Sequence, residues 1–424
     1  MPMNIPEEIS SETLTEHFFR NEYGKIVSVI TRYIGADHVE TAEDIVQETL
    51  LKAVDHWQQN GIPKNPQAWL YTTAKNLTLN ILKRKTYTKE YTAQLKHLQQ
   101  TTIPLDDFHL PEDLLADEQL KMMFVCCHPS ISEHSQIALI LKILCGFSIS
   151  EIAHAFYTTN ETINKRLVRG RKQLRENNVN FEIPQNVTSN LSIILKTIYL
   201  LFNEGYSPSK KNQIIRFDLC LEAIRLTEIL IQSKLIEKKT DCYALLALMY
   251  LNASRFKART NTDNSSIEME KQDRRLWNKE LINNGVHYLN KAIAEEQVSQ
   301  YLILATISAN HCVAPSFNVT NWDEILSLYD KLILLEDSPI TRLNRSVALA
   351  EVKGNTQAIK ELLLLASNSD IGNYYLFHST LSEFYKKTKN VVAALKHYNK
   401  AISLALNKRD IDFLQKKIKT VVPI

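Results

Sequence analysis

The residues with the most distinctive chemistry lie between positions 148 and 175, in SISEIAHAFYTTNETINKRLVRGRKQLR. Ser148 and Glu151 have the S-x-x-E spacing of a capping box, which predicts that a short helix begins at Ser148. Residues 157–159 interrupt it, and Asn160 is a favourable N-cap for a second helix. The second helix carries an apolar stripe at steps of four, three and four, formed by Ile163, Leu167, Gly170 and Leu174.

The second predicted helix is strongly basic outside this stripe. Between residues 160 and 175, Glu161 is the only acid, and the bases are Lys165, Arg166, Arg169, Arg171, Lys172 and Arg175. A short helix followed by a cationic amphipathic one is the unit that lays a recognition helix in the major groove of DNA. A solvated amphipathic helix is the competing interpretation, and the turn lacks the glycine that such motifs often carry.

In DNA recognition, two kinds of side chain on this helix would have different roles. Lysine and arginine supply affinity by contacting phosphates, and residues near the helix start read base edges. Thr162, Asn164, Lys165 and Arg166 are predicted to reach bases. Arg169 and Arg171 are predicted to add further DNA contacts.

A second basic segment runs from Lys64 to Lys89 and contains no acid. Its basic residues are interleaved with aromatic ones, and it also carries Asn76 and Asn80. The basic residues are Lys64, Lys75, Lys83, Arg84, Lys85 and Lys89, and the aromatic residues are Trp69, Tyr71 and Tyr87. Cations for phosphates and rings for unpaired bases suit a single-stranded nucleic acid, with each stack worth about 1 to 3 kcal/mol. Core packing is an equal alternative for Trp69. The inward residues of the predicted helix 68–85 are Trp69, Leu70, Thr73, Leu77 and Ile81.

Between the two basic segments, residues 104–118 are acidic and contain no lysine or arginine. Pro104 and Pro111 favour an extended linker there. Upstream, the segment 41–57 is predicted to be a helix with Asp44, Gln47, Glu48 and Lys52 outward and Ile45, Val46, Thr49, Leu50 and Val54 buried. The sequence therefore predicts two basic helical modules on an acidic tether.

Composition limits the remaining possibilities. The 424 residues include only nine glycines, with no sustained strand alternation, which predicts an all-α protein. The six cysteines form no disulfide framework, and Cys126, Cys127 and His128 have no partner pair at metal-ligand spacing. No signal peptide or membrane-length apolar run is evident, so we expect a cytoplasmic protein. The spacing of the cysteines and histidines leads us to expect no metal, and we expect no cofactor. Phosphate loops and catalytic motifs are absent, and Glu204 is expected to be structural, so we expect no enzyme.

The second half of the chain has a repeating helical pattern. The tetrad Asn-Lys-Ala-Ile at 290–293 recurs at 399–402, a distance close to three units of about 36 residues. Tyr385, Ala394, Tyr398 and Ala401 have the spacing of tetratricopeptide packing residues. We therefore predict a tetratricopeptide-like α-solenoid, with a generic helical bundle as the alternative.

Three segments together resemble the sigma-70 family in its extracytoplasmic-function (ECF) branch. They are DIVQETLLKA at 44–53, AWLYTTAKNLTLNILKRK at 68–85 and the helix-turn-helix at 148–175. Three further segments resemble the ECF group that has a long C-terminal helical extension. They are MMFVCCHPSIS at 122–132, LLFNEGYSPS at 200–209 and EKQDRRLWNKELI at 270–282. The resemblance implies sigma region 2 at 10–88, a linker at 89–117, sigma region 4 at 118–178 and the extension at 186–424.

The resemblance also implies roles for individual residues. Asp44, Gln47 and Glu48 would bind the clamp helices of core RNA polymerase. The linker would thread toward the active-site channel, and the helix from Asn160 would read the minus-35 element. The minus-10 element would be melted and read by Asn60, Lys64, Trp69, Tyr71, Lys75, Asn76, Asn80, Lys83 and Arg84.

These observations predict a sigma factor that binds core RNA polymerase and promoter DNA, with the C-terminal repeats tuning its activity through an intramolecular or peptide contact. A helix-turn-helix regulator with a ligand- or peptide-sensing repeat domain is the alternative. A peptide-binding scaffold is a third interpretation, and it should lack salt-dependent DNA binding.

Overall fold

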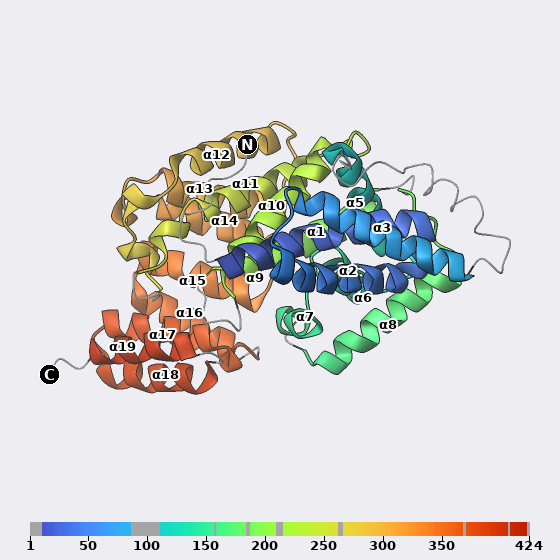
Figure 1. Ribbon diagram of the computed structural model, residues 1–424. Coiled ribbons are helices and arrows are strands. Elements are labelled where there is room, and N and C mark those ends of the chain that lie inside the picture. The colour runs from blue at the N-terminus through green and yellow to red at the C-terminus, as the bar shows by residue number, and fades with distance from the viewer. Residues whose placement is uncertain are drawn as a thin grey trace. The chain divides into compact units, whose positions relative to one another are not determined.

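The computed structural model describes residues 11–421, apart from 86–110, 157, 184–186, 209–214, 262–265, 368–369 and 406–407. Every named element in these ranges is helical, so the all-α prediction is confirmed (Figure 1). The only strand-like pairing found there is one isolated bridge between Thr260 and Ser266. The chain divides into two compact units, residues 1–201 with 232–236, and residues 202–231 with 237–424.

The first unit is built around α1, which contacts α2, α3, α5 and α6. Ile26, Val27 and Ile30 of α1 are fully buried and form the centre of this core. The elements are α1 (Ser11–Ile34), the 3-10 turn η1 (Ala36–His38), α2 (Val39–Asn60), α3 (Pro66–Lys85), α5 (Glu112–Cys126), α6 (Glu133–Ile143), α7 (Ile149–Ala155) and α8 (Asn160–Glu176).

The extended linker predicted for residues 104–118 is wrong over its last part. Residues 86–110 lie outside the described residues, but α5 begins at Glu112, directly after Pro111. Proline is compatible with a helix start, and Glu112 and Asp113 in the first turn favour the positive end of the helix dipole. Leu115 and Glu118 of this segment are buried, and Glu118 accepts a hydrogen bond from Arg32 of α1 at 2.8 Å.

The helix-turn-helix prediction is confirmed in its local details. The backbone N–H of Ser148 donates to the Glu151 carboxylate at 2.8 Å, and the N–H of Glu151 donates to the Ser148 hydroxyl at 3.2 Å. The N-cap of α8 is Thr159 rather than Asn160, because its hydroxyl accepts from the N–H of Thr162. The predicted stripe of α8 is buried as expected, at Ile163, Leu167, Gly170 and Leu174.

α9 (Thr188–Tyr206) begins in the first unit and ends in the second. In the second unit, helices that follow one another in sequence contact each other from α11 to α19. They are α10 (Phe217–Gln232), α11 (Thr240–Ala253), α12 (Lys279–Ile293), α13 (Gln300–Val313), α14 (Trp322–Leu335), α15 (Pro339–Lys353), α16 (Asn355–Ser367), α17 (Tyr375–Lys387), α18 (Val391–Leu404) and α19 (Lys408–Lys419).

The residues with tetratricopeptide-like spacing form the core of the last helices. Ala394, Tyr398 and Ala401 of α18 are fully buried, and Tyr385 of α17 packs against them. Ala292, in the earlier copy of the tetrad, is also fully buried. Small residues at these positions let neighbouring helices approach closely. The assignment to the tetratricopeptide class itself stays a prediction.

Candidate nucleic-acid interface

α2 exposes the polar face that the sequence predicted. Asp44, Gln47 and Glu48 are exposed, whereas Ile45, Val46 and Thr49 on the opposite face are buried. Val54 was expected in the core but is exposed, and Leu51 next to this face is 67% exposed. The exposed face of α2 therefore combines these polar side chains with two apolar ones, Leu51 and Val54.

α3 buries a different stripe from the one predicted. The fully buried side chains are Ala68, Leu70, Tyr71, Ala74, Thr78 and Leu82. Thr73, Leu77 and Ile81, which were expected inside, are only half-buried. The small residues of the observed stripe allow α3 to pack closely on α1 and α2, and this close approach sets the rotation of the helix.

This rotation separates the two aromatic residues proposed to stack on DNA bases. Tyr71 is 6% exposed and belongs to the core, so its ring is not available for stacking on a base. Trp69 is half-buried, and its ring contacts Trp57 edge-on at 5.8 Å and His56 at 5.3 Å. Trp57 also stacks on Phe19 at 5.4 Å. The sequence reasoning did not include Trp57, although its aromatic character and its place at the end of α2 were visible.

The remaining predicted residues of this surface lie mostly at the exterior. Asn60 and Lys64, at the end of α2 and in the following loop, are exposed. On α3, Asn76, Asn80 and Lys83 are exposed; the side chain of Arg84 lies outside the described residues. Lys75 is half-buried, and this burial lowers the pKa of its ammonium group.

α8 presents an exposed cationic face. Asn164, Lys165 and Arg169 are exposed, as are Lys172 and Arg175, which were not among the predicted DNA contacts. Lys165 pairs with Glu161 at 2.6 Å, and such a solvent-exposed pair is weak and easily exchanged for a phosphate. Arg169 and Arg175 have no carboxylate partner among the described residues.

Three other predicted DNA contacts on α8 have partners inside the protein. Thr162 is half-buried, and its side chain and N–H both hydrogen-bond with the hydroxyl of Thr159. The Arg166 guanidinium lies over the Phe156 ring, 5.3 Å from its centroid. Arg171 donates to the buried Glu43 carboxylate on α2 at 2.6 Å. The exposed cations of α8 therefore overlap only partly with the DNA contacts that the sequence predicted: Lys165 and Arg169 belong to both sets, and Arg175 is exposed although it was not predicted.

The Arg171–Glu43 pair joins the helix-turn-helix to α2. Only 2% of the Glu43 side chain and 16% of the Arg171 side chain are exposed. Burial raises the pKa of the Glu43 carboxyl, an effect larger than the opposing effect of the Arg171 charge. The hydroxyl of Tyr23 donates to Glu43 at 3.4 Å, and burial raises the pKa of this phenol as well. The buried Glu43 carboxylate thus depends on Arg171 for charge compensation, and the neutral Tyr23 phenol adds a hydrogen bond.

α1 makes a second connection to the same module. Arg20 donates to the carbonyl of Cys145 and pairs with Glu151, each at 3.4 Å, while its guanidinium lies over the Phe147 ring. A Cβ added at Gly24 would lie 2.1 Å from the backbone oxygen of Leu144, so glycine is required for this close approach. The two predicted DNA-binding modules are therefore packed together within one unit.

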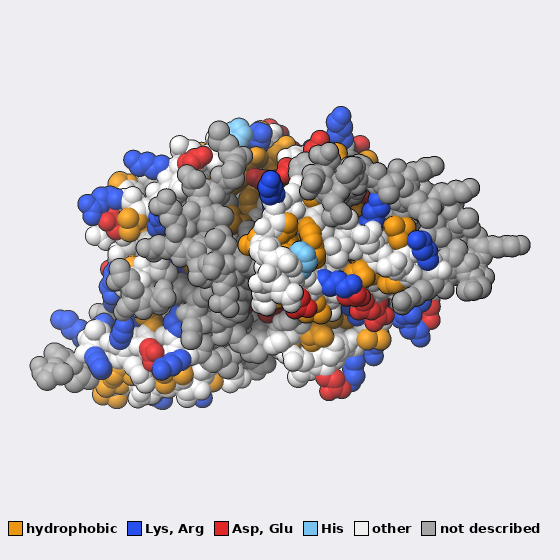
Figure 2. Space-filling model, viewed as in Figure 1, with side chains coloured by type: hydrophobic (Ala, Val, Ile, Leu, Met, Phe, Trp, Pro, Cys, Tyr) orange, Lys and Arg blue, Asp and Glu red, His pale blue; other side chains and the backbone are white. Residues whose placement is uncertain are grey.

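Acidic, basic and apolar side chains are interspersed on the viewed face of the first unit (Figure 2). Among the described residues, no group of histidine, cysteine, aspartate and glutamate side chains is arranged to hold a metal ion. Cys126 and Cys127 are buried at the end of α5, and burial raises the pKa of both thiols. None of the described helices combines the length and hydropathy needed to cross a membrane.

Comparison with known proteins separates the two parts of the chain. Residues 18–87 match the Sigma-70 region 2 family, and residues 190–293 match a family of unknown function, DUF6596. SigW, an ECF RNA polymerase sigma factor of Bacillus subtilis, is 27% identical over 155 residues, which cover 36% of this chain and 82% of SigW. YlaC, an RNA polymerase sigma factor of the same organism, is 27% identical over 167 residues, covering 38% of this chain and 90% of YlaC.

A relative of similar length matches nearly the whole chain. The uncharacterized protein R00370 of Rhizobium meliloti is 30% identical over 396 residues, which cover 90% of each chain. No solved structure matches the chain. The chain therefore belongs to the family of R00370, and its region 2 domain and its similarity to ECF sigma factors place it among sigma-70-like, ECF-like sigma factors.

Proposed function

We propose that the protein binds core RNA polymerase through the exposed face of α2 and directs initiation at promoters read by α3 and α8. The observation that carries this proposal is the combination of two surfaces in one compact unit. α2 offers Asp44, Gln47 and Glu48 beside the exposed Leu51, and α8 offers free cations on its outer face. The acidic and amide groups suit a basic protein partner, and the cations suit DNA phosphates.

On this proposal, polymerase binding depends on the polar face of α2. Replacing Asp44 and Glu48 together by alanine removes two rim carboxylates and leaves in place Gln47, whose side chain hydrogen-bonds with the buried Tyr23 phenol. The free chain should stay folded and lose affinity for core polymerase. Glu237→Ala, which removes an exposed acid from the second unit, is the matched control. A wild-type chain that fails to bind core polymerase in a pull-down would eliminate the proposal.

Promoter recognition would be divided between the two DNA-binding surfaces. The minus-10 strand would meet Asn60, Lys64 and the exposed residues of α3, with Trp69 at the edge of an aromatic cluster. The minus-35 duplex would meet Asn164, Lys165 and Arg169 of α8. Selecting promoter fragments with reconstituted holoenzyme, followed by run-off transcription, tests this division, because only a sigma factor makes initiation by core polymerase specific for the selected sequence.

The second unit would tune this activity. Its successive helix pairs favour a tetratricopeptide-like surface that contacts another segment or a peptide. Run-off transcription by the full chain and by a chain that ends after α9 compares the two states directly. Equal transcription by two equally well-folded proteins would exclude a regulatory role for the second unit.

A further inference from the structure

Three arginines gather around two aromatic rings in the second unit. Arg255 follows α11, Arg259 follows the 3-10 turn η3 (Phe256–Ala258), and Arg274 begins the 3-10 turn η5 (Arg274–Leu276). The guanidinium carbons of Arg274 and Arg255 lie 4.1 Å and 5.6 Å from the centroid of Trp277. Those of Arg259 and Arg255 lie 3.6 Å and 5.9 Å from the centroid of Tyr206. Arg255 therefore shares a ring with each of the other two.

The hydrogen-bond acceptors for these guanidinium groups are neutral. Arg274 donates to the backbone carbonyls of His311 and, at 2.9 Å, Ala314. Arg259 donates to the carbonyl of Tyr206 at 2.6 Å, and Arg255 donates to the hydroxyl of the same tyrosine. Among the described residues, none of the three arginines pairs with a carboxylate.

The nearest acid along the sequence does not neutralise the cluster. Asp273 pairs with Arg275 at 2.7 Å, and that arginine points into solvent, with 90% of its side chain exposed. Arginines are rarely buried without a charged partner, and neutral carbonyls satisfy N–H groups without cancelling their charge. The cluster therefore concentrates uncompensated positive charge in a mostly buried location.

Four nitrogen atoms around the cluster are buried without a hydrogen-bond partner among the described atoms. They are Nε of Arg255, Nη2 of Arg274, Nε1 of Trp277 and Nδ1 of His311. Buried polar atoms of native proteins almost always have hydrogen-bond partners, so four such nitrogens gathered in one place require an explanation. The two arginine nitrogens and the indole nitrogen can act only as donors, so they require an acceptor.

The electrostatic effects on neighbouring groups show that the cluster is positively charged. Burial lowers the pKa of both Arg259 and Arg274, and in each case Arg255 lowers it further. The pKa of His311 falls to about 4, first because the ring is buried and then because Arg255 and Arg274 repel a further positive charge. A negative charge at this position would relieve all of these effects.

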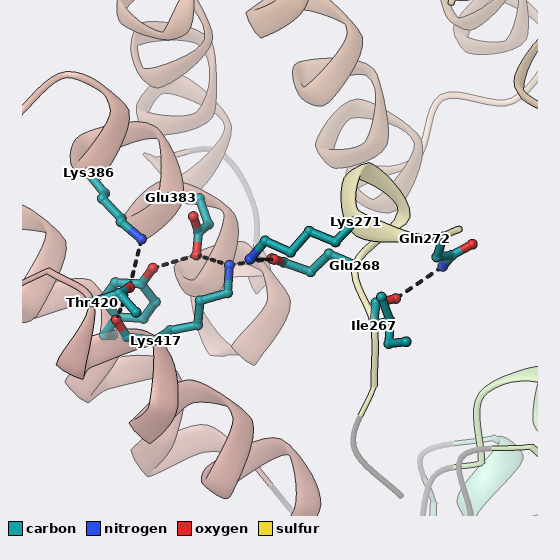
Figure 3. Close-up of polar contacts among 9 residues, drawn as sticks. Ile267, Glu268, Lys271, Gln272, Glu383, Lys386, Lys417 and Thr420 are labelled. Carbon is teal, nitrogen blue, oxygen red and sulfur yellow. Dashed lines mark hydrogen bonds and ion pairs between the residues drawn. The ribbon is translucent and has the colours of Figure 1, made fainter. Parts of the chain in front are cut away.

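The segment that carries Arg274 follows residues that polar contacts tie to α17 and α19 (Figure 3). Lys417 of α19 bridges Glu268, which precedes this segment, and Glu383 of α17, the latter at 2.9 Å. The Gln272 side chain donates to the carbonyl of Ile267 at 3.0 Å. Arg274 is thus positioned by the fold rather than by a ligand, so the cluster is organised before anything binds.

We propose that Arg255, Arg259 and Arg274 form a binding site for a small oxyanion, a free molecule with a carboxylate or phosphate group. The planar guanidinium group suits both kinds of group because it can donate two parallel hydrogen bonds. Trp277 and His311 would supply further donors. Arg259, Arg274 and His311 are each partly exposed.

Isothermal titration of the full chain tests the proposal, with inorganic phosphate and succinate as separate ligands at constant ionic strength set with sodium chloride. We expect saturable binding of at least one ligand, at one site per chain. Arg274→Gln should weaken that binding by at least roughly tenfold because it removes a charged donor. Arg275→Gln, the neighbouring exposed arginine, should change it by less than about twofold. Phosphate binding alone or succinate binding alone would identify the class of anion.

A second measurement separates ligand binding from a purely structural role of the cluster. Histidine ring signals followed by NMR should show that the bound anion raises the apparent pKa of His311, while His397 in α18 is unaffected. The proposal is overturned if neither ligand binds the wild-type chain, or if Arg275→Gln weakens binding as much as Arg274→Gln. These results bear on the second unit alone and leave the proposed polymerase binding untouched.

Discussion

At the scale of single residues, Arg169 and Arg171, two positions apart on α8, have opposite environments. Arg169 is exposed without a carboxylate partner among the described residues, whereas Arg171 pairs with the buried Glu43 at 2.6 Å. An exposed cation can exchange water for phosphate at little cost, but a buried pair leaves a costly unpaired charge when broken. The two side chains should therefore respond differently to the same substitution.

Arg171→Met should lower the free energy of unfolding of the first unit by about 3 to 5 kcal/mol, because Glu43 would remain buried without its cation. Urea denaturation followed by circular dichroism measures this change. Arg169→Met is the control and should change the free energy by less than about 0.5 kcal/mol. Similar losses for both variants would contradict the role of the Arg171–Glu43 pair.

His311 should make the stability of the second unit depend on pH. Its pKa is about 4 in the folded chain and ordinarily 6.5, so the folded state binds fewer protons between these values. The contribution of the neutral His311 ring to the free energy of unfolding is therefore fully present above pH 6.5 and is lost as pH falls toward 4. The melting temperature of the wild type should drop more steeply over this window than that of His311→Gln. Parallel curves would contradict the prediction; a residual slope from His397 is expected in both proteins.

At the scale of helices, the close approach of α1 to the turn after α6 depends on one glycine. Gly24→Ala would place a Cβ 2.1 Å from the backbone oxygen of Leu144, and backbone cannot move aside as a flexible side chain can. We expect a loss of about 1 to 3 kcal/mol or more, measured as a lower melting temperature. Gly372→Ala, whose added Cβ would meet nothing within 4 Å, should leave the melting temperature nearly unchanged.

The outer face of α8 should contribute to DNA affinity mainly through phosphate contacts. Arg169→Ala and Arg175→Ala should each reduce the slope of log K against log salt by about 1 in promoter binding by the holoenzyme. Fluorescence anisotropy at several salt concentrations measures this slope. Lys238→Ala, which removes an exposed lysine of the second unit, serves as the control. An unchanged slope for both arginine variants would mean that this face does not contact the DNA backbone.

At the scale of the whole molecule, the compact units do not end where the composition changes. The sequence suggested a boundary between residues 178 and 186, but contacts assign residues up to 201 to the first unit. The first part of α9 buries Ile194, Leu195 and Ile198, and Lys196 pairs with Glu133 of α6 at 2.7 Å. The first unit thus includes part of a helix that also serves the second.

A chain that ends after residue 206 should therefore be more stable than one that ends after residue 185. The shorter chain loses α9, and with it the apolar surface that this helix buries, at about 25 cal/mol per Å². Thermal unfolding of the two fragments measures the difference. Equal melting temperatures would show that α9 contributes nothing to the first unit, and would move the boundary back to the one suggested by composition.

The local structure of this protein could be predicted from its sequence. Helical periodicity, the Ser148–Glu151 capping box and the buried stripe of α8 depend on residues three or four positions apart, and such interactions are legible along the chain. The exposed face of α2 followed from the same periodicity. The predicted buried stripe of α3 was wrong by about one position. Small residues can face either the core or solvent, and only the close packing of α3 on α1 and α2 determines which of them are buried.

Only the tertiary structure decided which charges are free and which are paired. Glu43 and Arg171 are far apart in sequence, and nothing local distinguishes Arg171 from Arg169 on the same basic helix. The cluster formed by Arg255, Arg259 and Arg274 likewise draws on separate segments of the second unit. Such groupings arise from long-range packing, since side chains without sequence proximity share an environment only after the helices between them have folded together.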